Sequence, residues 1–201
     1  MFPSHVSPWE QGTLLLVDES AVEGKLARFR ADSGNTGRLT PVPPVENQRM
    51  LIAPIPSALE HEAVRLWRDC GLVRPWNDPD ADLARALDGP SSTVLGAVAD
   101  EQLLGTVMVG HDGHRGWVYY LAVQPDHRGN GLGRELMSAA ESWLREQGVP
   151  KLQLMVRADN SAVIEFYKRL GYVDQQVAVL GRFFDEELQE LRDQKSSERL
   201  R

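Results

Sequence analysis

The most regular hydrophobic pattern of the chain lies between residues 117 and 148. Trp117 to Val123 is an unbroken apolar, aromatic and β-branched run, which predicts a strand buried on both faces. Pro125 ends it, because proline has no N–H for the ladder. Apolar residues then recur at helical spacing until Gly148 and Pro150, which predicts a long amphipathic helix. Its apolar positions are Leu132, Leu136, Met137, Ala140 and Leu144.

Shorter periodic segments surround this centre and define the remaining elements. Before the long helix they predict a strand over 50–55, a helix capped by Ser57 and ended by Gly71, and a short helix that begins at Asp78-Pro79. Strands over 92–99 and 103–109 follow, joined by a turn at Asp100-Glu101. After the long helix they predict a strand over 151–156, a helix from Asp159 or Asn160 to Leu170, and a last strand over 172–180. This order predicts an α/β fold with a mixed, mostly antiparallel sheet and helices on both faces.

The two ends of the chain are patterned differently from its middle. Residues 1–49 hold one short apolar run, Leu14 to Val17, and then a glycine- and proline-rich stretch, so we expect a flexible N-terminal extension. Regular patterning starts at Met50, a candidate natural start, and whether the extension belongs to the physiological protein stays open. Alternating charge and leucine predict a helical tail over 183–201, which leaves one domain over 50–182.

Composition narrows the class of protein. The 201 residues are 42% hydrophobic, enough to build one core, and the net charge of −7 argues against nucleic acid as the main partner. Cys70 is the only cysteine, so no intramolecular disulfide forms and no zinc cluster is indicated. The apolar runs are too short for a signal or membrane segment. We therefore predict a cytoplasmic protein without metal, membrane or nucleic-acid partners, and a homodimer is one state the sequence permits.

The segment between the buried strand and the long helix has the features of an anion site. Gly129, Gly131 and Gly133 let a ligand approach the backbone closely, and Arg128 and Arg134 add positive charge. A helix that begins here presents unpaired N–H groups and the positive end of its dipole. The sequence therefore predicts a phosphate or pyrophosphate ligand, with an empty glycine-rich turn as the simpler alternative.

Two common phosphate-binding loops do not fit the spacing. A P-loop needs a Lys-Ser or Lys-Thr pair after its last glycine, whereas Gly133 is followed by Arg134. A dinucleotide loop needs G-x-G-x-x-G, and the third position is occupied by Arg134 or Leu136, depending on the glycine from which it is counted. The pattern thus weakens a dinucleotide-dependent oxidoreductase as the function.

A third family does fit. Arg128-x-x-Gly131-x-Gly133 after Leu121-Ala122-Val123 resembles the acyl-CoA loop of the GCN5-related N-acetyltransferases (GNATs). The run from Asn160 to Tyr172 resembles the second signature of this family, and the order of elements over residues 50–182 is the GNAT order. Arg74 to Asp78 and Gly113 to Gly116 look closer still to the YpeA-type bacterial members. Gly171 to Phe183 departs from the family, because it is too short for the usual two C-terminal strands.

The resemblance implies an N-acyltransferase that moves an acetyl group from acetyl-CoA to a primary amine, on a small molecule or a peptide, by direct attack in a ternary complex. It implies that the central strand splays from its neighbour, and it implies a set of residues that bind the cofactor. These are Leu121, Ala122, Val123, Arg128, Gly129, Asn130, Gly131, Leu132, Gly133, Arg134 and Asn160. A non-catalytic acyl-CoA-binding regulatory module is the alternative.

The catalytic groups are only partly visible in the sequence. Tyr167 matches the family's tyrosine that protonates the leaving thiolate, although a tyrosine at the edge of the core is an alternative. Asn160 is either a cofactor contact or a plain N-cap. The identity of the general base stays open: it is either a water relay or one of five side chains. The acidic residues of the short helix either attract a cationic amine or form a solvated face. The base candidates are His111, Asp112, His114, Tyr119 and Tyr120, and the acidic residues are Asp78, Asp80, Asp82 and Asp88.

Overall fold

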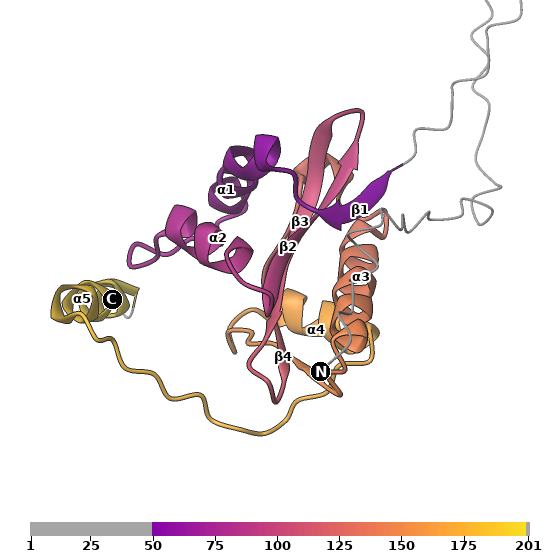
Figure 1. Ribbon diagram of the computed structural model, residues 1–201. Coiled ribbons are helices and arrows are strands. Elements are labelled where there is room, and N and C mark those ends of the chain that lie inside the picture. The colour runs from indigo at the N-terminus through magenta and orange to yellow at the C-terminus, as the bar shows by residue number, and fades with distance from the viewer. Residues whose placement is uncertain (1–49, 200–201) are drawn as a thin grey trace, which may run out of the picture.

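The computed structural model describes residues 50–199, so the predicted run at Leu14 and the extension over 1–49 lie outside the described residues (Figure 1). The strands are β1 (Leu51–Pro54), β2 (Ser92–Ala99), β3 (Gln102–His111), β4 (Gly116–Val123) and β5 (Leu152–Gln153). The α-helices are α1 (Glu60–Asp69), α2 (Pro79–Leu87), α3 (Leu132–Glu146), α4 (Ser161–Arg169) and α5 (Glu186–Arg199), and the 3₁₀ turns are η2 (Ser57–Leu59) and η3 (Pro125–His127).

The strands form one sheet in the order β1-β2-β3-β4-β5. Neighbouring strands are antiparallel except β4 and β5, which are parallel, so the predicted mixed, mostly antiparallel sheet is confirmed. The β2–β3 hairpin turns where the sequence predicts it, at Asp100 and Glu101, whose φ angles of 49° and 62° match a two-residue type I′ turn. The connections β2–β3 and β3–β4 are thus short hairpins, whereas α1 and α2 lie between β1 and β2, and α3 lies between β4 and β5.

Helices cover both faces of the sheet, as predicted (Figure 1). On one face α1 and α2 bury a cluster centred on Trp67, Leu83 and Leu103. On the other face α3 packs its apolar stripe against Leu95, Val107 and other sheet residues. All five apolar positions predicted for α3 are buried, and Gly148, at a φ of +72°, follows its end.

Two predicted helix starts have different outcomes. Asp78 caps α2 as predicted, accepting the Ala81 N–H at 3.0 Å, with Pro79 as the first helical residue. The predicted cap at Ser57 is wrong, because Ser57 opens the 3₁₀ turn η2 and α1 begins only after Leu59, without a side-chain cap. One tight turn therefore moves the helix start along the chain.

Three strand predictions are corrected. β4 is not buried on both faces, because Tyr119 is 45% exposed where the sheet is open to a pocket. The strand expected over 151–156 has only two paired residues. The strand expected over 172–180 is absent among the described residues. β5 is too short to offer it a ladder, and Gln176, at a φ of +52° beside an Asp174 turn, interrupts the extended run.

Candidate active site

The middle of β4 is bent by a β-bulge. Between the pairs Thr106↔Ala122 and Met108↔Tyr119, the single residue Val107 of β3 opposes two residues of β4. One of these two, Tyr120, has a φ of +48°, which is unusual for a residue other than glycine. Bulges of this kind re-aim the strand that carries them.

Beyond the bulge, one edge of β4 is open. The ladder to β5 consists of Gly116↔Leu152 and Trp117↔Gln153 and stops there, as expected if the two strands splay apart. On the other edge, the Gln124 N–H donates to Leu104 O at 2.9 Å. Because N–H directions alternate along a strand, the N–H groups of Leu121 and Val123 point toward the open edge. Their side chains pack into the core, so only their backbone is available to a ligand.

The loop after β4 has the geometry expected for an anion site. Gly129 and Gly131 have φ angles of 82° and 92°, and no atom outside the loop lies near the place of a Gly129 side chain. Within the described residues, the N–H groups of residues 129 to 133 have no hydrogen-bond partner. Five free donors at the start of the 15-residue helix α3 form a fitting cradle for a pyrophosphate. Leu132 is buried, so it offers its backbone alone.

The two arginines of the loop are placed differently. The Arg128 guanidinium turns back, donating from Nε to Val123 O at 3.0 Å and from Nη2 to Cys70 Sγ at 3.2 Å. In this structure Arg128 therefore ties the loop to the end of β4 and to α1. Arg134 is exposed, as is Asn130.

Helix α4 lies beside this loop and carries two of the predicted residues, Asn160 as its N-cap and Tyr167 within it. A side chain at Gly133 would begin 3.4 Å from the Phe166 ring, so α4 packs closely on the start of α3. Tyr167 is mostly buried, with its ring edge-on to Phe166 and Tyr172 at centroid distances of 5.0 and 5.7 Å. Burial raises the pKa of Tyr167 to about 12. Asn160 caps α4, accepting the Val163 N–H at 3.3 Å, which satisfies the simpler of its two predicted roles.

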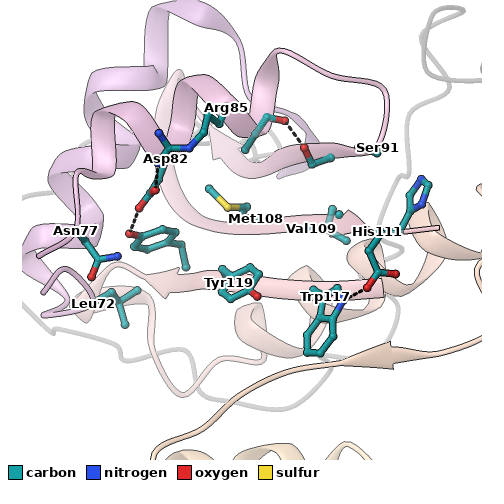
Figure 2. A pocket seen from close by; sticks show the side chains of 15 residues that line it. Leu72, Asn77, Asp82, Arg85, Ser91, Met108, Val109, His111, Trp117 and Tyr119 are labelled. Carbon is teal, nitrogen blue, oxygen red and sulfur yellow. Dashed lines mark hydrogen bonds and ion pairs between the residues drawn. The ribbon is translucent and has the colours of Figure 1, made fainter. Parts of the chain in front are cut away.

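A pocket of about 630 Å³ lies on the α2 face of the sheet, against the first half of β4 (Figure 2). Its lining combines aromatic and apolar groups with two carboxylates, Asp82 from α2 and Asp112 from the β3–β4 turn. The lining residues include Asn77, Asp82, Arg85, Met108, His111, Asp112, Trp117, Tyr119 and Tyr120.

The carboxylate of Asp112 is held in place by three donors. Oδ1 accepts the N–H groups of His114 and Arg115 at 2.8 and 2.7 Å, and Oδ2 accepts the Trp117 indole N–H at 3.0 Å. These bonds, that of Arg115 foremost, hold the pKa of Asp112 far below its ordinary value. The group therefore stays negative and is a very weak base.

The other predicted bases gain little support from their surroundings. Burial is the main cause of the raised pKa values of Tyr119 and Tyr120, with Asp112 and Asp82 adding to it respectively. His111 is at the rim of the pocket with its ring turned outward, and its Nδ1 accepts the Gly113 N–H at 3.3 Å (Figure 2). His114 is exposed and does not line the pocket.

Only one of the four acidic residues of the short helix reaches the pocket. Asp82 accepts the Tyr120 hydroxyl at 2.7 Å and pairs with Arg85. Asp78 is the helix cap, Asp80 pairs with Arg68 at 2.7 Å, and Asp88 ends the helix. The solvated-face interpretation therefore fits Asp78, Asp80 and Asp88, and attraction of a cationic amine stays a prediction for Asp82 alone.

Sequence analysis missed the residues that connect these parts. Trp67 and Thr106 lie 39 residues apart and share a buried hydrogen bond, and Met108 and Trp117 line the pocket from neighbouring strands. The one available signal was Thr106, a polar residue inside an otherwise apolar strand. No cluster of metal-ligating side chains is found among residues 50–199. In that same part of the chain, no helix combines the length and the hydrophobicity that crossing a membrane requires.

Comparison with known proteins identifies the family. Residues 60–172 match the sequence model described as "Acetyltransferase (GNAT) family". A protein named acetyltransferase from Yersinia pestis (strain Pestoides F) is 46% identical over 121 residues, which cover 60% of this chain and 86% of that relative.

Solved structures agree on the fold. The aminoglycoside N-acetyltransferase AAC(6')-Iy, solved with CoA, has a TM-score of 0.61 at 17% identity and covers 72% of this chain and 99% of its own. The same enzyme with a bisubstrate analogue, CoA-S-monomethyl-acetylneamine, has a TM-score of 0.59 at 17% identity, covering 68% and 99%. With the family match over more than half of its length, the chain belongs to the GNAT family and is an N-acetyltransferase whose co-substrate is acetyl-CoA.

Proposed function

We propose that this chain acetylates a primary amine that attacks acetyl-CoA directly while both substrates are bound. The observation that carries this proposal is the course of β4. Trp117 and Tyr119 in its first half line the 630 Å³ pocket, and the glycine loop follows its last residue. One strand therefore connects a candidate acceptor site with a candidate cofactor site, and its open edge lies between them.

On the cofactor side, we assign the pyrophosphate to the free N–H groups of residues 129 to 133. The backbone at Leu121, Ala122 and Val123 runs along the open edge and is suited to the pantetheine arm. Arg134 is free to approach a phosphate, whereas Arg128 would have to leave Val123 O to do so. We also assign to this arm Asn160, which stands at the start of α4.

On the acceptor side, the pocket favours a protonated amine group. Asp112 remains anionic, and its partner Trp117 and the exposed ring of Tyr119 present aromatic surface next to it. A cation that lies above an aromatic ring and beside a carboxylate is stabilised by both groups, through the cation–π interaction and through charge attraction. Asp82 carries the second negative charge, which Arg85 partly offsets.

In the transfer itself, the bound ammonium first gives one proton to water; the neutral amine nitrogen then bonds the thioester carbonyl carbon, the C–S bond breaks, and the sulfur leaves as a thiolate. The N–H groups at the open edge donate to the carbonyl oxygen as charge develops there; one such donor is worth about 3 kcal/mol. Tyr167 donates to the sulfur, and the proton lost by the amine goes to water. Since the pKa of Tyr167 is about 12, its phenol is protonated at neutral pH and available as a donor.

Full proton transfer from Tyr167 would be uphill. A thiol of pKa near 8.5 is about 3.5 pKa units more acidic than this tyrosine, a gap of roughly 5 kcal/mol. We therefore assign Tyr167 the role of hydrogen-bond donor to the sulfur during bond cleavage, with the thiol proton supplied in the end by solvent. The bisubstrate analogue bound by the aminoglycoside enzyme of this fold supports a reaction in which both substrates are bound together.

A panel experiment tests the proposal. The protein is incubated with acetyl-CoA and small amines, polyamines, peptide N-termini or lysine peptides, and released CoA and acceptor mass are followed together. We expect at least one amine to gain one acetyl group for each CoA released. Acetyl-CoA binding without an acetylated product from any amine would instead support the non-catalytic acyl-CoA module.

A further inference from the structure

A single buried hydroxyl connects three elements next to the bulge of β4. Thr106 is fully buried, and its Oγ1 accepts the Trp67 indole N–H at 2.8 Å. The same oxygen donates to the backbone carbonyl of Tyr120 at 3.2 Å. Since a hydroxyl has one donor hydrogen, that hydrogen is committed to Tyr120. Helix α1, strand β3 and strand β4 thus meet at one atom.

The residue held by this hydroxyl is also the strained one. Tyr120 has its φ of +48° at the bulge, a conformation that persists only where the surroundings fix it. Its ring stacks on Trp67, with centroids 4.1 Å apart and planes 12° apart, and its hydroxyl donates to Asp82 at 2.7 Å. These contacts fix the side chain of Tyr120. The bond from Thr106 restrains the peptide group itself.

The bulge lies directly before the open-edge N–H groups. Tyr120 is followed at once by Leu121, and Val123 comes two residues later, so the direction of both N–H groups depends on how the bulge is held. A rotation of the Tyr120 peptide would turn the Leu121 N–H, which belongs to that same peptide unit. The hydroxyl of Thr106 therefore acts on a candidate catalytic donor through one intervening carbonyl.

We propose that Thr106 is a positioning residue for acetyl transfer: its hydroxyl fixes the Tyr120 peptide and thereby aims the Leu121 N–H across the open edge of β4. This inference rests on the proposed function, in which that N–H faces the thioester carbonyl. Thr106 touches no substrate in this account. A role confined to satisfying the Trp67 indole in the core is the alternative to be tested.

The test compares Thr106→Val with Thr106→Ser. Valine keeps the shape of threonine and removes both hydrogen bonds, whereas serine keeps the hydroxyl and loses a methyl group. We expect Thr106→Val to lower kcat about tenfold or more, the scale of one misplaced donor. The Kd for CoA, measured by calorimetry, should change less than about threefold, because the glycine loop is untouched. Thr106→Ser should recover most of kcat.

A matched core variant separates positioning from stability. Val94 is fully buried in the same cluster and lies on β2, which β3 separates from the bulged strand. Val94→Ala should lower the melting temperature at least as much as Thr106→Val and leave kcat within about twofold, measured below both melting temperatures. A fall in kcat that follows melting temperature across all three variants would overturn the proposal, as would unchanged kcat in Thr106→Val.

Hydrogen exchange tests the same idea without turnover. In the free protein, Thr106→Val should speed exchange of the Ala122 and Gln124 amides, which face β3 directly after the bulge, about tenfold, with those of β2 unchanged. Unchanged exchange at these amides would refute the positioning role even if kcat falls. If the wild-type protein acetylates no amine, the proposed function fails, and this exchange comparison still decides whether Thr106 holds the bulge.

Discussion

At the scale of single residues, Gly131 carries the clearest test of cofactor binding. Its φ is +92°, and a side chain there would meet only Glu135 Oε1, 3.9 Å from the first added atom, in this structure. Gly131→Glu should therefore leave the fold intact but place bulk and negative charge in the N–H cradle. We expect CoA affinity, measured by calorimetry, to fall at least about tenfold, or 1.4 kcal/mol.

Gly148 offers the matched control for that substitution. It also has a positive φ, of +72°, with open space around it, but it lies after the far end of α3. Gly148→Glu should lose a similar amount of stability and bind CoA normally. Equal affinities for the wild-type protein and Gly131→Glu would place the pyrophosphate elsewhere.

Tyr167 can be tested by removing one oxygen. In the proposed reaction its hydroxyl donates to the leaving sulfur, so Tyr167→Phe should reduce kcat by about 10²-fold while the ring keeps its packing on Phe166. Tyr172→Phe is the control, because its hydroxyl donates to Glu141 at 2.7 Å on the outer side of α3. The control should lose some stability and keep its turnover. Normal single-turnover kinetics in Tyr167→Phe would remove that tyrosine from the mechanism.

The sequence predicted the residues that belong to a local pattern. Gly131 and Tyr167 stand within contiguous motifs, so their neighbourhood could be inferred from spacing. Thr106 and Asp82 act through partners 39 and 38 residues away along the chain, Trp67 and Tyr120, and no local spacing reveals such pairs. The hydrogen bond from Arg128 to Cys70, 58 residues away, could not be predicted for the same reason.

At the scale of elements, the β2–β3 turn allows a direct stability prediction. Glu101 has a φ of 62° in the second position of the type I′ turn, where glycine is preferred. Glu101→Gly should therefore stabilise the protein by about 0.5–1 kcal/mol, raising the melting temperature by about 1–4 °C. Gln102→Gly, one residue later and inside β3, should lower it. A lower melting temperature in Glu101→Gly would contradict the assigned turn.

Helices and strands could be predicted from the sequence where the elements that they pack against or pair with could be predicted too. The apolar stripe of α3 packs against the sheet, and β2 pairs with β3, its neighbour in the chain. Both elements therefore form as predicted. The run from 172 to 180 has strand-type residues but no neighbour, since β5 ends at Gln153 and Gln176 breaks the extension. A strand forms only where a neighbouring strand satisfies its backbone hydrogen bonds, and the hydrophobic pattern of one segment does not show whether such a neighbour exists.

At the scale of the whole molecule, the four tyrosines provide a pH signature. Tyr119, Tyr120, Tyr167 and Tyr172 all have raised pKa values, chiefly through burial, with that of Tyr167 at about 12. Folding favours their protonated forms. Their contribution to stability is therefore fully present below pH 10, near the unfolded pKa, and is lost as the pH rises through 12 and above.

Absorbance at 295 nm reports this ionisation. At pH 10.5 about three quarters of the tyrosines should be ionised in 8 M urea, from an unfolded pKa near 10, and far fewer in the native protein. We expect the native titration to rise late and to coincide with alkaline unfolding. Superimposed native and urea curves would show that these hydroxyls are not protected.

Direct transfer between two bound substrates is most directly tested by a single-turnover experiment. The protein is loaded with an equimolar amount of acetyl-CoA labelled in the acetyl group, an active amine from the panel is added, and quenched samples are separated into protein, CoA and acceptor. We predict that the label stays on CoA until the amine arrives and then appears on the acceptor alone, with one CoA released for each acetylated amine. Label bound covalently to the protein before the amine is added, or CoA released without acetylated amine, would contradict direct attack in a ternary complex.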